Sequence, residues 1–362
     1  MSKLSTDSYK GVRDFYPEDQ FIQNYIFGIW KKTLETSGYE EYGASILEPS
    51  EIYKEKSGDE IVNEQTFTFK DRGEREVTLR PEMTPTVARM VAAKRRELGF
   101  PLRWYSIPNL FRYEAPQRGR LREHWQLNAD IFGVKTIEAD IEMISLANMI
   151  MFAFGATSSD FEIRLNTNSG NMDELDMVVR ILKSINITNV KIDPTLKRGQ
   201  TYYTGVVFEF FDTNSANSRS ILGGGRYDDL ISLFSDDKVP AVGFAVGDVT
   251  MRDFLETHNL SPAYRPATDL FMVLRDNAQA TVLPFYKLVY DIQKVGVNVA
   301  TCQSDKDAGD LYKTVEKLKI PFIAFVDAET ISSGELTIKN MQTREEHKIS
   351  TKHLSEVKDI VK

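Results

Sequence analysis

Apolar and polar residues alternate along residues 123–131, which predicts a β-strand with one buried face and one polar face. The odd positions carry Trp125, Leu127, Ala129 and Ile131, and the even positions carry Gln126, Asn128 and Asp130. Residues 111–113 begin another extended run, and Pro116 and Gly119 mark a turn between the two. We therefore predict a strand, a tight loop and a second strand whose polar face forms the floor of a pocket.

The loop of this predicted hairpin is rich in arginine, at Arg112, Arg118, Arg120 and Arg122. Guanidinium groups bind phosphate through paired hydrogen bonds, so the cluster predicts a phosphate site. The alternative is an exposed hairpin with a solvated charged tip, because many charged loops are merely solvated.

Helical and strand periodicities alternate through the rest of the first 256 residues. The pair Thr84–Pro85 suits the start of a helix, and the preceding Glu82 either belongs to that start or is a pocket carboxylate. The pattern predicts helices over residues 21–37, 84–98, 137–154 and 173–185 and from residue 248, and strands at residues 46–47, 65–69, 77–79, 161–165, 206–211 and 239–247. Hairpins and long strands with helices between them favour an antiparallel sheet, which suits a nucleotide and a small polar substrate.

Three consecutive glycines, Gly223, Gly224 and Gly225, follow the predicted strand 206–211. Because they lack side chains, they allow a ligand to approach the backbone closely. A flexible linker is the alternative, although the flanking residues 221–222 and 226–227 do not have linker composition. The helix predicted from residue 248 presents its N-terminus as a candidate anion site.

The pattern changes after residues 257–268, which contain Pro262 and Pro266 and are predicted to be a linker. Beyond them we predict strands at residues 270–274, 297–300 and 322–326, helices at 278–295 and 308–318, a hairpin across 336–348 and a terminal helix from 355. Alternating strand and helix units predict a small α/β domain with a largely parallel sheet.

Composition and charge narrow the function without identifying it. A chain of 362 residues predicts two domains, and its single cysteine excludes an intrachain disulfide and a cysteine cluster for metal. The four histidines show no metal-ligand spacing, so we expect no metal apart from an ion that arrives with a nucleotide. The net charge of -8 argues against bulk attraction to nucleic acid, but it does not exclude a local basic groove. Without an apolar signal stretch or a run of about 18 apolar residues, we expect a cytoplasmic protein.

Six ordered motifs give the chain a resemblance to a known family. FRYEAPQRGRLREHWQ at 111–126 resembles the second signature motif of class II aminoacyl-tRNA synthetases, in the form found in histidyl-tRNA synthetases. RGQTYYTGVVFE at 198–209 and SILGGGRYD at 220–228 resemble the two histidine-specific motifs of that family. KGVRDFYPE at 10–18, LRPEMT at 79–84 and PAVGFAVG at 240–247 follow the family order.

The resemblance covers nearly the whole chain and implies a fold in two parts. Residues 1–256 are expected to form the class II catalytic domain, an α+β fold with an antiparallel sheet flanked by helices. Residues 257–268 are expected to be the linker, and residues 269–362 resemble the α/β anticodon-binding domain of class IIa synthetases. The implied activity is ligation of L-histidine to tRNA(His) through a histidyl-adenylate, with ATP and Mg²⁺, in a homodimer without membrane contact.

The resemblance also implies roles for individual residues. Catalytic roles fall on Arg112 and Arg198, which would stabilise charge on the α-phosphate, and ATP would contact Arg112, Glu114, Arg120 and Arg122. Histidine would contact Glu82, Thr84, Gln126, Asp130, Arg198, Tyr202, Tyr203, Gly223, Gly224 and Gly225. Glu82 and Thr84 would hold its ammonium, and Asp130 and Tyr203 its imidazole. No protein nucleophile is implied, so catalysis would be positioning and electrostatics.

The chain departs from the family pattern at several positions. Gln200–Thr201 stand where Leu-Asp is common, and Ser45 replaces a proline of the first motif. Ala115 replaces an arginine of the motif 2 loop, which bears on how the 5′ guanosine of the tRNA is recognised. Val249–Thr250 replace the Glu-Arg of the third motif, which bears on how adenine is held. Arg252 lies roughly 200° further round a helix at about 100° per residue, so it does not simply replace that arginine.

The segment between the second motif and Arg198 is also short. Residues 134–197 have room for two helices and a strand, so the helical insertion domain of the family is predicted to be absent. A paralogue without ligase activity, such as the histidine-sensing regulatory subunit of ATP phosphoribosyltransferase, is therefore a second hypothesis. A non-catalytic RNA-binding protein is a third, but it would not need the pocket residues.

Overall fold

The computed structural model describes residues 3–54, 65–198, 201–276 and 278–362. The chain forms two compact units, Met1–Pro262 and Ala263–Lys362, and the boundary between them falls within the segment 257–268. No helix in the described part of the chain combines the length and the apolar character needed to cross a bilayer. Gly199 and Gln200 of the motif at 198–209 lie outside the described residues.

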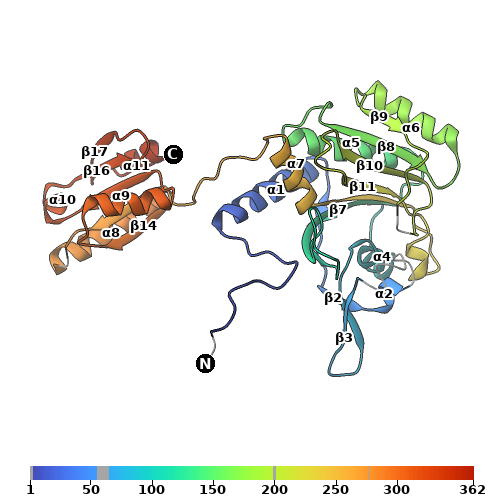
Figure 1. The fold of residues 1–362 in the computed structure, drawn as a ribbon, viewed down its shortest axis with the longest axis horizontal. Coiled ribbons are helices and arrows are strands. Elements are labelled where there is room, and N and C mark those ends of the chain that lie inside the picture. Colours follow the sequence, from blue (N-terminus) through green and yellow to red (C-terminus); the bar gives the residue numbers. More distant parts are fainter. Residues whose placement is uncertain (1–2, 55–64, 199–200, 277) are drawn as a thin grey trace. The chain divides into compact units, whose positions relative to one another are not determined.

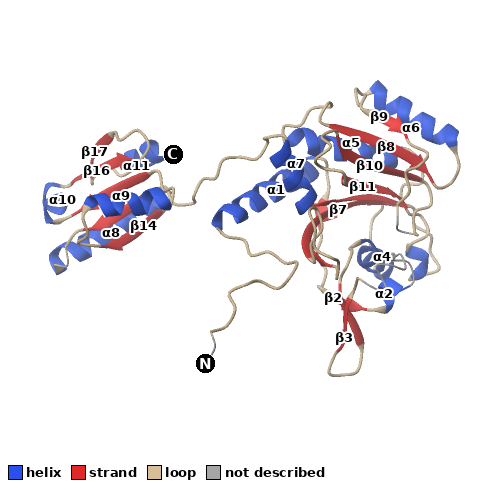
Figure 2. Ribbon diagram, viewed as in Figure 1, coloured by secondary structure: helices blue, strands red, loops and turns tan. Residues whose placement is uncertain are grey.

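The first unit is built on one large sheet, shown in Figures 1 and 2. The strand order across it is β1-β5-β7-β12-β11-β10-β8-β9, with β6 paired to β7. The strands are β1 Glu40–Glu41, β5 Leu102–Ser106, β6 Asn109–Phe111, β7 Glu123–Phe132, β8 Phe161–Thr167, β9 Val190–Ile192, β10 Val206–Asp212, β11 Ser220–Arg226 and β12 Ala241–Gly247. Neighbouring strands are antiparallel except for the short outer pairs β1–β5 and β8–β9.

One face of this sheet is covered by helices α1 Pro17–Thr36, α5 Glu138–Ala153, α6 Met172–Ser184 and α7 Asp248–Thr257. Helix α1 buries Ile26, Trp30 and Leu34 completely, because residues four apart lie on one side of a helix. These side chains join Leu127, Ala129 and other residues of the same sheet face in the main core. The helices therefore leave the opposite face of β7, β12 and β11 for the pocket.

The pocket side is closed by smaller elements. Helix α4 Thr84–Ala93, the short helix α2 Glu51–Lys54 and the 3-10 turn η1 Ile231–Leu233 lie there, with a separate sheet ordered β2-β4-β3. Its strands are β2 Leu47–Pro49, β3 Phe67–Lys70 and β4 Glu76–Leu79. Val87 and Val91 of α4 pack with Tyr202, Tyr227 and neighbouring residues in a second core, which anchors α4 beside the pocket.

The second unit is a sheet ordered β14-β13-β15-β16-β17. Its strands are β13 Leu270–Leu274, β14 Val299–Gln303, β15 Phe322–Val326, β16 Glu335–Asn340 and β17 Glu346–Ser350, and its helices are α8 Gln279–Lys294, α9 Ala308–Lys317, α10 Ala328–Ser333 and α11 Ser355–Val361. The first three strands of the order are parallel and the last two antiparallel. This matches the predicted largely parallel sheet with a closing hairpin.

The predicted fold class is confirmed: an antiparallel-dominated sheet flanked by helices, and a small C-terminal α/β unit. Several details differ from the prediction. Strand β5 was not predicted, because its sequence LRWYS does not alternate, and α10 was not predicted either. The helix predicted to reach residue 98 ends at Ala93, where a charged run begins. The glycine triplet follows the predicted strand, β10, and itself lies inside a further strand, β11.

Candidate active site

Strand β7 has the polar face that its alternation predicted. Leu127, Ala129 and Ile131 are buried beneath the helices, so the even positions point to the other side of the sheet. Strand pairing arranges the residues of that side in rows: Asp130 with Gly243 and Gly225, Asn128 with Ala245 and Gly223, and Gln126 with Gly247. Because β12 and β11 contribute only Gly and Ala to these rows, the sheet offers an open floor between larger side chains.

A cavity of about 120 Å³ lies over one part of this floor. It is lined by Glu82, Thr84, Arg112, Gln126, Asn128, Asp130, Arg198, Tyr202, Tyr203, Tyr227, Gly243, Phe244 and Ala245. Every residue predicted for the amino-acid site except the three glycines of β11 is among them, although these residues come from distant parts of the chain. Tyr227 and Gly243 were not predicted as site residues.

Asp130 is the buried acceptor of this smaller cavity. Its Oδ1 accepts a hydrogen bond from the Tyr227 hydroxyl, and its buried Oδ2 has no hydrogen-bond partner within the described residues. An added Cβ at Gly243 would lie 2.1 Å from Asp130 Oδ1, so only glycine leaves room for this carboxyl. Burial raises the pKa of Asp130 from 3.8 to about 7, against the lowering effect of the Tyr227 hydrogen bond. A ligand N–H group would satisfy the free oxygen.

We expect Asp130→Asn to change how stability depends on pH. The folded-state pKa of Asp130 lies above its unfolded value, so the stability it contributes is full below about pH 4 and falls as the pH rises towards 7. A shift of about 3 units corresponds to a few kcal/mol, on the order of 1.4 kcal/mol per unit. The variant lacks this titration, so its stability relative to the wild type should rise between pH 4 and pH 8.

Urea unfolding at several pH values, followed by tryptophan fluorescence, measures this difference. All three tryptophans, Trp30, Trp104 and Trp125, lie in the first unit. Parallel stability profiles for the variant and the wild type would contradict the raised pKa of Asp130.

Glu82 is a pocket carboxylate rather than a helix cap. Its side chain is buried, with 4% of its surface exposed, and its Oε2 accepts a hydrogen bond of 3.3 Å from the Tyr202 hydroxyl. The N-cap of α4 is Met83, without a side-chain capping bond. Of the two interpretations of Glu82 in the sequence, the structure therefore favours the pocket.

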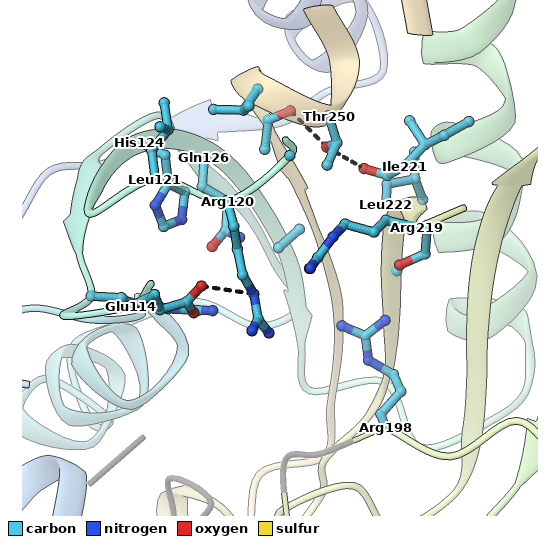
Figure 3. A pocket seen from close by; sticks show the side chains of 17 residues that line it. Glu114, Arg120, Leu121, His124, Gln126, Arg198, Arg219, Ile221, Leu222 and Thr250 are labelled. Carbon is cyan, nitrogen blue, oxygen red and sulfur yellow. Dashed lines mark hydrogen bonds and ion pairs between the residues drawn. The ribbon is translucent and has the colours of Figure 1, made fainter. Parts of the chain in front are cut away.

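A larger cavity of about 310 Å³ adjoins the first (Figure 3). It is lined by Arg112, Glu114, Gly119, Arg120, Leu121, His124, Gln126, Arg198, Arg219, Ser220, Ile221, Leu222, Gly223, Ala245, Gly247, Val249 and Thr250. Arg112 is oriented by a 2.8 Å hydrogen bond from its Nε to the Pro81 carbonyl, and Arg120 forms a 2.7 Å ion pair with Glu114. Burial and the nearby Arg112 and Arg13 lower the pKa of His124 to about 3, so its ring is neutral at pH 7.

Arg122 is turned away from both cavities. Its guanidinium donates to the Glu114 carbonyl and the Tyr9 hydroxyl and lies 3.9 Å from the ring centre of Tyr113. Only 9% of its surface is exposed. It holds the loop to the N-terminal segment, and this placement disagrees with the expectation that Arg122 contacts ATP. A sequence pattern does not distinguish a guanidinium that pairs with protein from one that pairs with a ligand.

The three glycines of β11 also have different surroundings. Gly223 lines the larger cavity, whereas Gly224 and Gly225 do not line either cavity, contrary to the expectation that all three line the histidine pocket. An added Cβ at Gly224 would lie 2.2 Å from the Gly243 carbonyl oxygen, and one at Gly225 would lie 2.9 Å from Tyr203. Strand packing therefore accounts for Gly224, whereas Gly225 leaves room for the ring of Tyr203, which lines the smaller cavity.

Arg198 lines both cavities. Its Nη1 donates a 2.8 Å hydrogen bond to Glu209 on β10, and its buried Nε has no hydrogen-bond partner within the described residues. An added Cβ at Gly223 would lie 1.7 Å from Nη1, so Arg198 occupies space that only glycine leaves empty. Its side chain is 13% exposed, and Figure 3 shows it pointing into the larger cavity.

The two cavities meet at Arg112, Gln126, Arg198 and Ala245, which line both. The guanidinium groups of Arg112 and Arg198 thus lie where a ligand in the smaller cavity would approach a ligand in the larger one. Fixed cations in a water-poor site stabilise negative charge that develops during a reaction. The arrangement can join a small amino-acid-sized ligand to a phosphate-bearing ligand.

The N-terminus of helix α7, predicted as a candidate anion site, is not available to a ligand. The carboxylate of Asp248 occupies it, completely buried, and accepts hydrogen bonds from Arg13, Gln23 and the Trp125 amide. Thr250 lines the larger cavity, but its Oγ1 donates to the Ile221 carbonyl at 2.9 Å. Position 250 therefore supplies no charge to the site.

Comparisons with known proteins agree with this geometry. The family model described as histidyl-tRNA synthetase matches residues 11–167 and 164–248, and the one described as anticodon binding domain matches residues 272–361. A histidine–tRNA ligase of Leptospira biflexa is 35% identical over 421 aligned positions that cover 96% of each chain. Because this chain has 362 residues, at least 59 of those positions (421 less 362) have no counterpart here, as the predicted short form requires.

Solved structures show the same fold. Apo histidyl-tRNA synthetase of S. aureus has a TM-score of 0.84 at 24% identity, with 99% of each chain covered. A Bacillus halodurans structure titled ATP phosphoribosyltransferase regulatory subunit/histidyl-tRNA synthetase has a TM-score of 0.74 at 20% identity, with 90% of this chain and all of that chain covered. The histidyl-tRNA synthetase match covers every residue of the smaller cavity and all of the larger one except Val249 and Thr250, and so this chain belongs to the histidyl-tRNA synthetase family.

Proposed function

We propose that this protein is a histidine–tRNA ligase that activates L-histidine with ATP and transfers the histidyl group to tRNA(His). The observation that carries the proposal is the meeting of the two cavities at Arg112 and Arg198. An amino acid in the smaller cavity and a triphosphate in the larger one would bring a carboxylate and an α-phosphate between these guanidinium groups.

The smaller cavity fits histidine at each of its polar groups. Glu82 would take the ammonium, with Thr84 beside it at the start of α4. Asp130 Oδ2 would accept an imidazole N–H, since it is buried and otherwise has no partner within the described residues. Tyr203 would contact the other side of the ring, while Tyr202 holds Glu82 in position. Gln126 and Arg198 would orient the carboxylate.

In the first step, a carboxylate oxygen of histidine attacks the α-phosphorus of ATP. The bond to the bridging oxygen breaks, and pyrophosphate leaves with the electron pair. Arg112 and Arg198 stabilise the charge that accumulates on the α-phosphate oxygens. In the second step, a ribose hydroxyl at the tRNA terminus attacks the carbonyl carbon of the adenylate, which forms the ester and releases AMP and a proton.

The larger cavity would hold ATP through Arg112, Glu114 and Arg120. Mg²⁺ would arrive as the counterion of the phosphates. Among the described residues, no group of three or more His, Cys, Asp or Glu side chains is placed to hold a metal ion. Arg122 is omitted from this set, because its guanidinium is engaged by Glu114 and Tyr9.

The tRNA would engage the second unit, whose residues 272–361 match the anticodon-binding family. The motif 2 loop carries Ala115 where the family pattern has arginine, so 5′ guanosine recognition would depend on other contacts.

We also propose a homodimer, for which the exposed apolar residues Ile46, Leu47 and Phe69 beside the three-stranded sheet offer surface to a second copy. We place the reaction in the cytoplasm, because protein synthesis consumes the charged tRNA there.

A regulatory protein that senses histidine is the second candidate. The short segment before Arg198 and the neutral Thr250 favour it. The anticodon-binding match and the coverage of 96% of a curated ligase favour the enzyme, because a sensor needs neither.

Histidine-dependent exchange between ATP and pyrophosphate discriminates between these two functions. We expect purified protein to exchange label with L-histidine, ATP and Mg²⁺, and to lose exchange when histidine is omitted. Calorimetric histidine binding without any exchange would contradict the ligase and support the sensor.

A further inference from the structure

The larger cavity is strongly cationic on a chain of net charge -8. Among the described residues that line it, four are arginines, Arg112, Arg120, Arg198 and Arg219, and one is a carboxylate, Glu114. Figure 3 shows the side chains of Arg120, Arg198 and Arg219 pointing into the same space. Like charges gathered in a cavity repel one another unless an anion lies between them.

Arg219 differs from the neighbouring arginines in having no hydrogen-bond or ion-pair partner among the residues that the structure describes. Arg120 pairs with Glu114, Arg198 pairs with Glu209, and Arg112 donates to the Pro81 carbonyl. The guanidinium of Arg219 forms no hydrogen bond or ion pair within the described part of the chain, although the residue is only partly exposed. A half-buried arginine whose donors are unused is a ready site for an anion.

We propose that Arg219 binds the β- and γ-phosphates of ATP and the pyrophosphate that leaves. The inference rests on the proposed function, because it assigns the far end of the same nucleotide site. Arg112 and Arg198 line the junction with the amino-acid cavity, where the α-phosphate reacts. Arg219 does not line the amino-acid cavity, so it serves the phosphates beyond the reacting one.

Strand geometry places Arg219 at a suitable separation. It precedes Ser220, the first residue of β11, and lies four positions before Gly223, against which Arg198 packs. Four residues of extended chain span about 13 Å at roughly 3.3 Å each. The side chain of Arg219 points back from its strand into the larger cavity, which Arg198 also lines (Figure 3).

The position of the Arg219 side chain is set by its surroundings. An added Cβ at Gly119 in the motif 2 loop would lie 3.1 Å from Arg219 Cδ, so the loop passes close to the arginine stem. Arg219 also lines a neighbouring cavity of about 80 Å³, together with Gly119, Ile221 and Thr250. Two other charged residues of this cavity, Arg118 and Asp253, form an ion pair of 3.8 Å with each other, and Thr250 is neutral and bonded to Ile221. Arg219 is therefore a charged group of this wall whose donors remain available to a ligand.

Arg219→Ala should weaken the binding of pyrophosphate and leave the binding of AMP unchanged. One charge-assisted contact accounts for about 10- to 100-fold in affinity. We expect the inhibition constant for pyrophosphate and the KM for ATP to rise by about that factor, while the KM for histidine and the binding of AMP stay within about twofold. Arg219→Lys should recover part of the loss, because it restores the charge without the paired donors.

Arg180→Ala is the matched control, because it removes the same charge from helix α6 and Arg180 lines none of the cavities described above. It should leave all four constants within about twofold. Weaker AMP binding with unchanged pyrophosphate binding would overturn the proposal and assign Arg219 to the base. No change in either ligand would overturn it as well.

Calorimetry with pyrophosphate and with AMP keeps this test separate from the proposed function. If the wild type binds pyrophosphate but catalyses no exchange, the ligase assignment fails while the Arg219 comparison remains decisive. If the wild type exchanges and Arg219→Ala binds pyrophosphate normally, the assignment of Arg219 alone fails.

Discussion

Replacing Arg198 with Ala is expected to slow histidyl-adenylate formation by about 10²-fold or more, the loss typical of removing one fixed electrostatic donor. Arg198 lines both cavities, so its guanidinium would contact the attacking carboxylate and the α-phosphate together. Glu209 holds it in place at 2.8 Å, and it therefore needs little rearrangement as charge develops. The fold should survive, because the apolar core beneath the sheet does not include Arg198.

Single-turnover formation of the adenylate measures this loss directly. Arg164→Ala is the matched control, since Arg164 pairs with Glu162 and Asp193 and lines neither cavity. It should react within about twofold of the wild type. An Arg198→Ala enzyme within threefold of the wild type would show that Arg198 has a structural role only.

Replacing Gly223 with Ala is expected to have an effect of similar size, although it removes no charged residue. The new methyl group would lie 1.7 Å from Arg198 Nη1 and 2.9 Å from Glu209 Cγ. Arg198 is flexible at its tip, so it would swing away while the strand stays in place. We expect adenylate formation to fall by about 10²-fold and the stability to fall by about 1–3 kcal/mol, the usual range for overpacking.

The double variant Gly223→Ala/Arg198→Ala tests this explanation. If the methyl group acts by displacing Arg198, the double variant should be no slower than Arg198→Ala, because the two changes remove one interaction. A double variant whose rate loss equals the product of the two single losses would contradict the displacement of Arg198. Gly28→Ala is the control for a glycine replacement, since its added Cβ meets nothing within 4 Å on helix α1 and should be neutral or stabilising by up to about 1 kcal/mol.

Much of the fold followed from short-range patterns. The alternation in β7 and the periodicity of α5 and α6 predicted their type and approximate ends. The alternation also predicted that Gln126, Asn128 and Asp130 share one face, because side chains of a strand point alternately to its two sides. Strand β5 escaped prediction, since its partial burial on both faces leaves no period to detect.

The site was less predictable, because residues of one type had several roles. Arg122 and Arg120 stand two positions apart in the same loop, yet one is buried in protein contacts and the other lines the nucleotide cavity. Gly243 was part of a recognised strand, but its role beneath Asp130 depends on the register between β12 and β7. Arg219 carried no motif signal at all.

The sequence by itself determined the two-unit organisation, the polar face of β7 and the family motifs, because each depends on residues close together in the chain. Only the tertiary structure decided which charged groups face a ligand. It placed Arg198 against Gly223, turned Arg122 towards Tyr9 and left Arg219 without a partner in the described part of the chain. Strand register and side-chain packing join distant segments, and the composition of each segment does not specify the neighbours that the others supply.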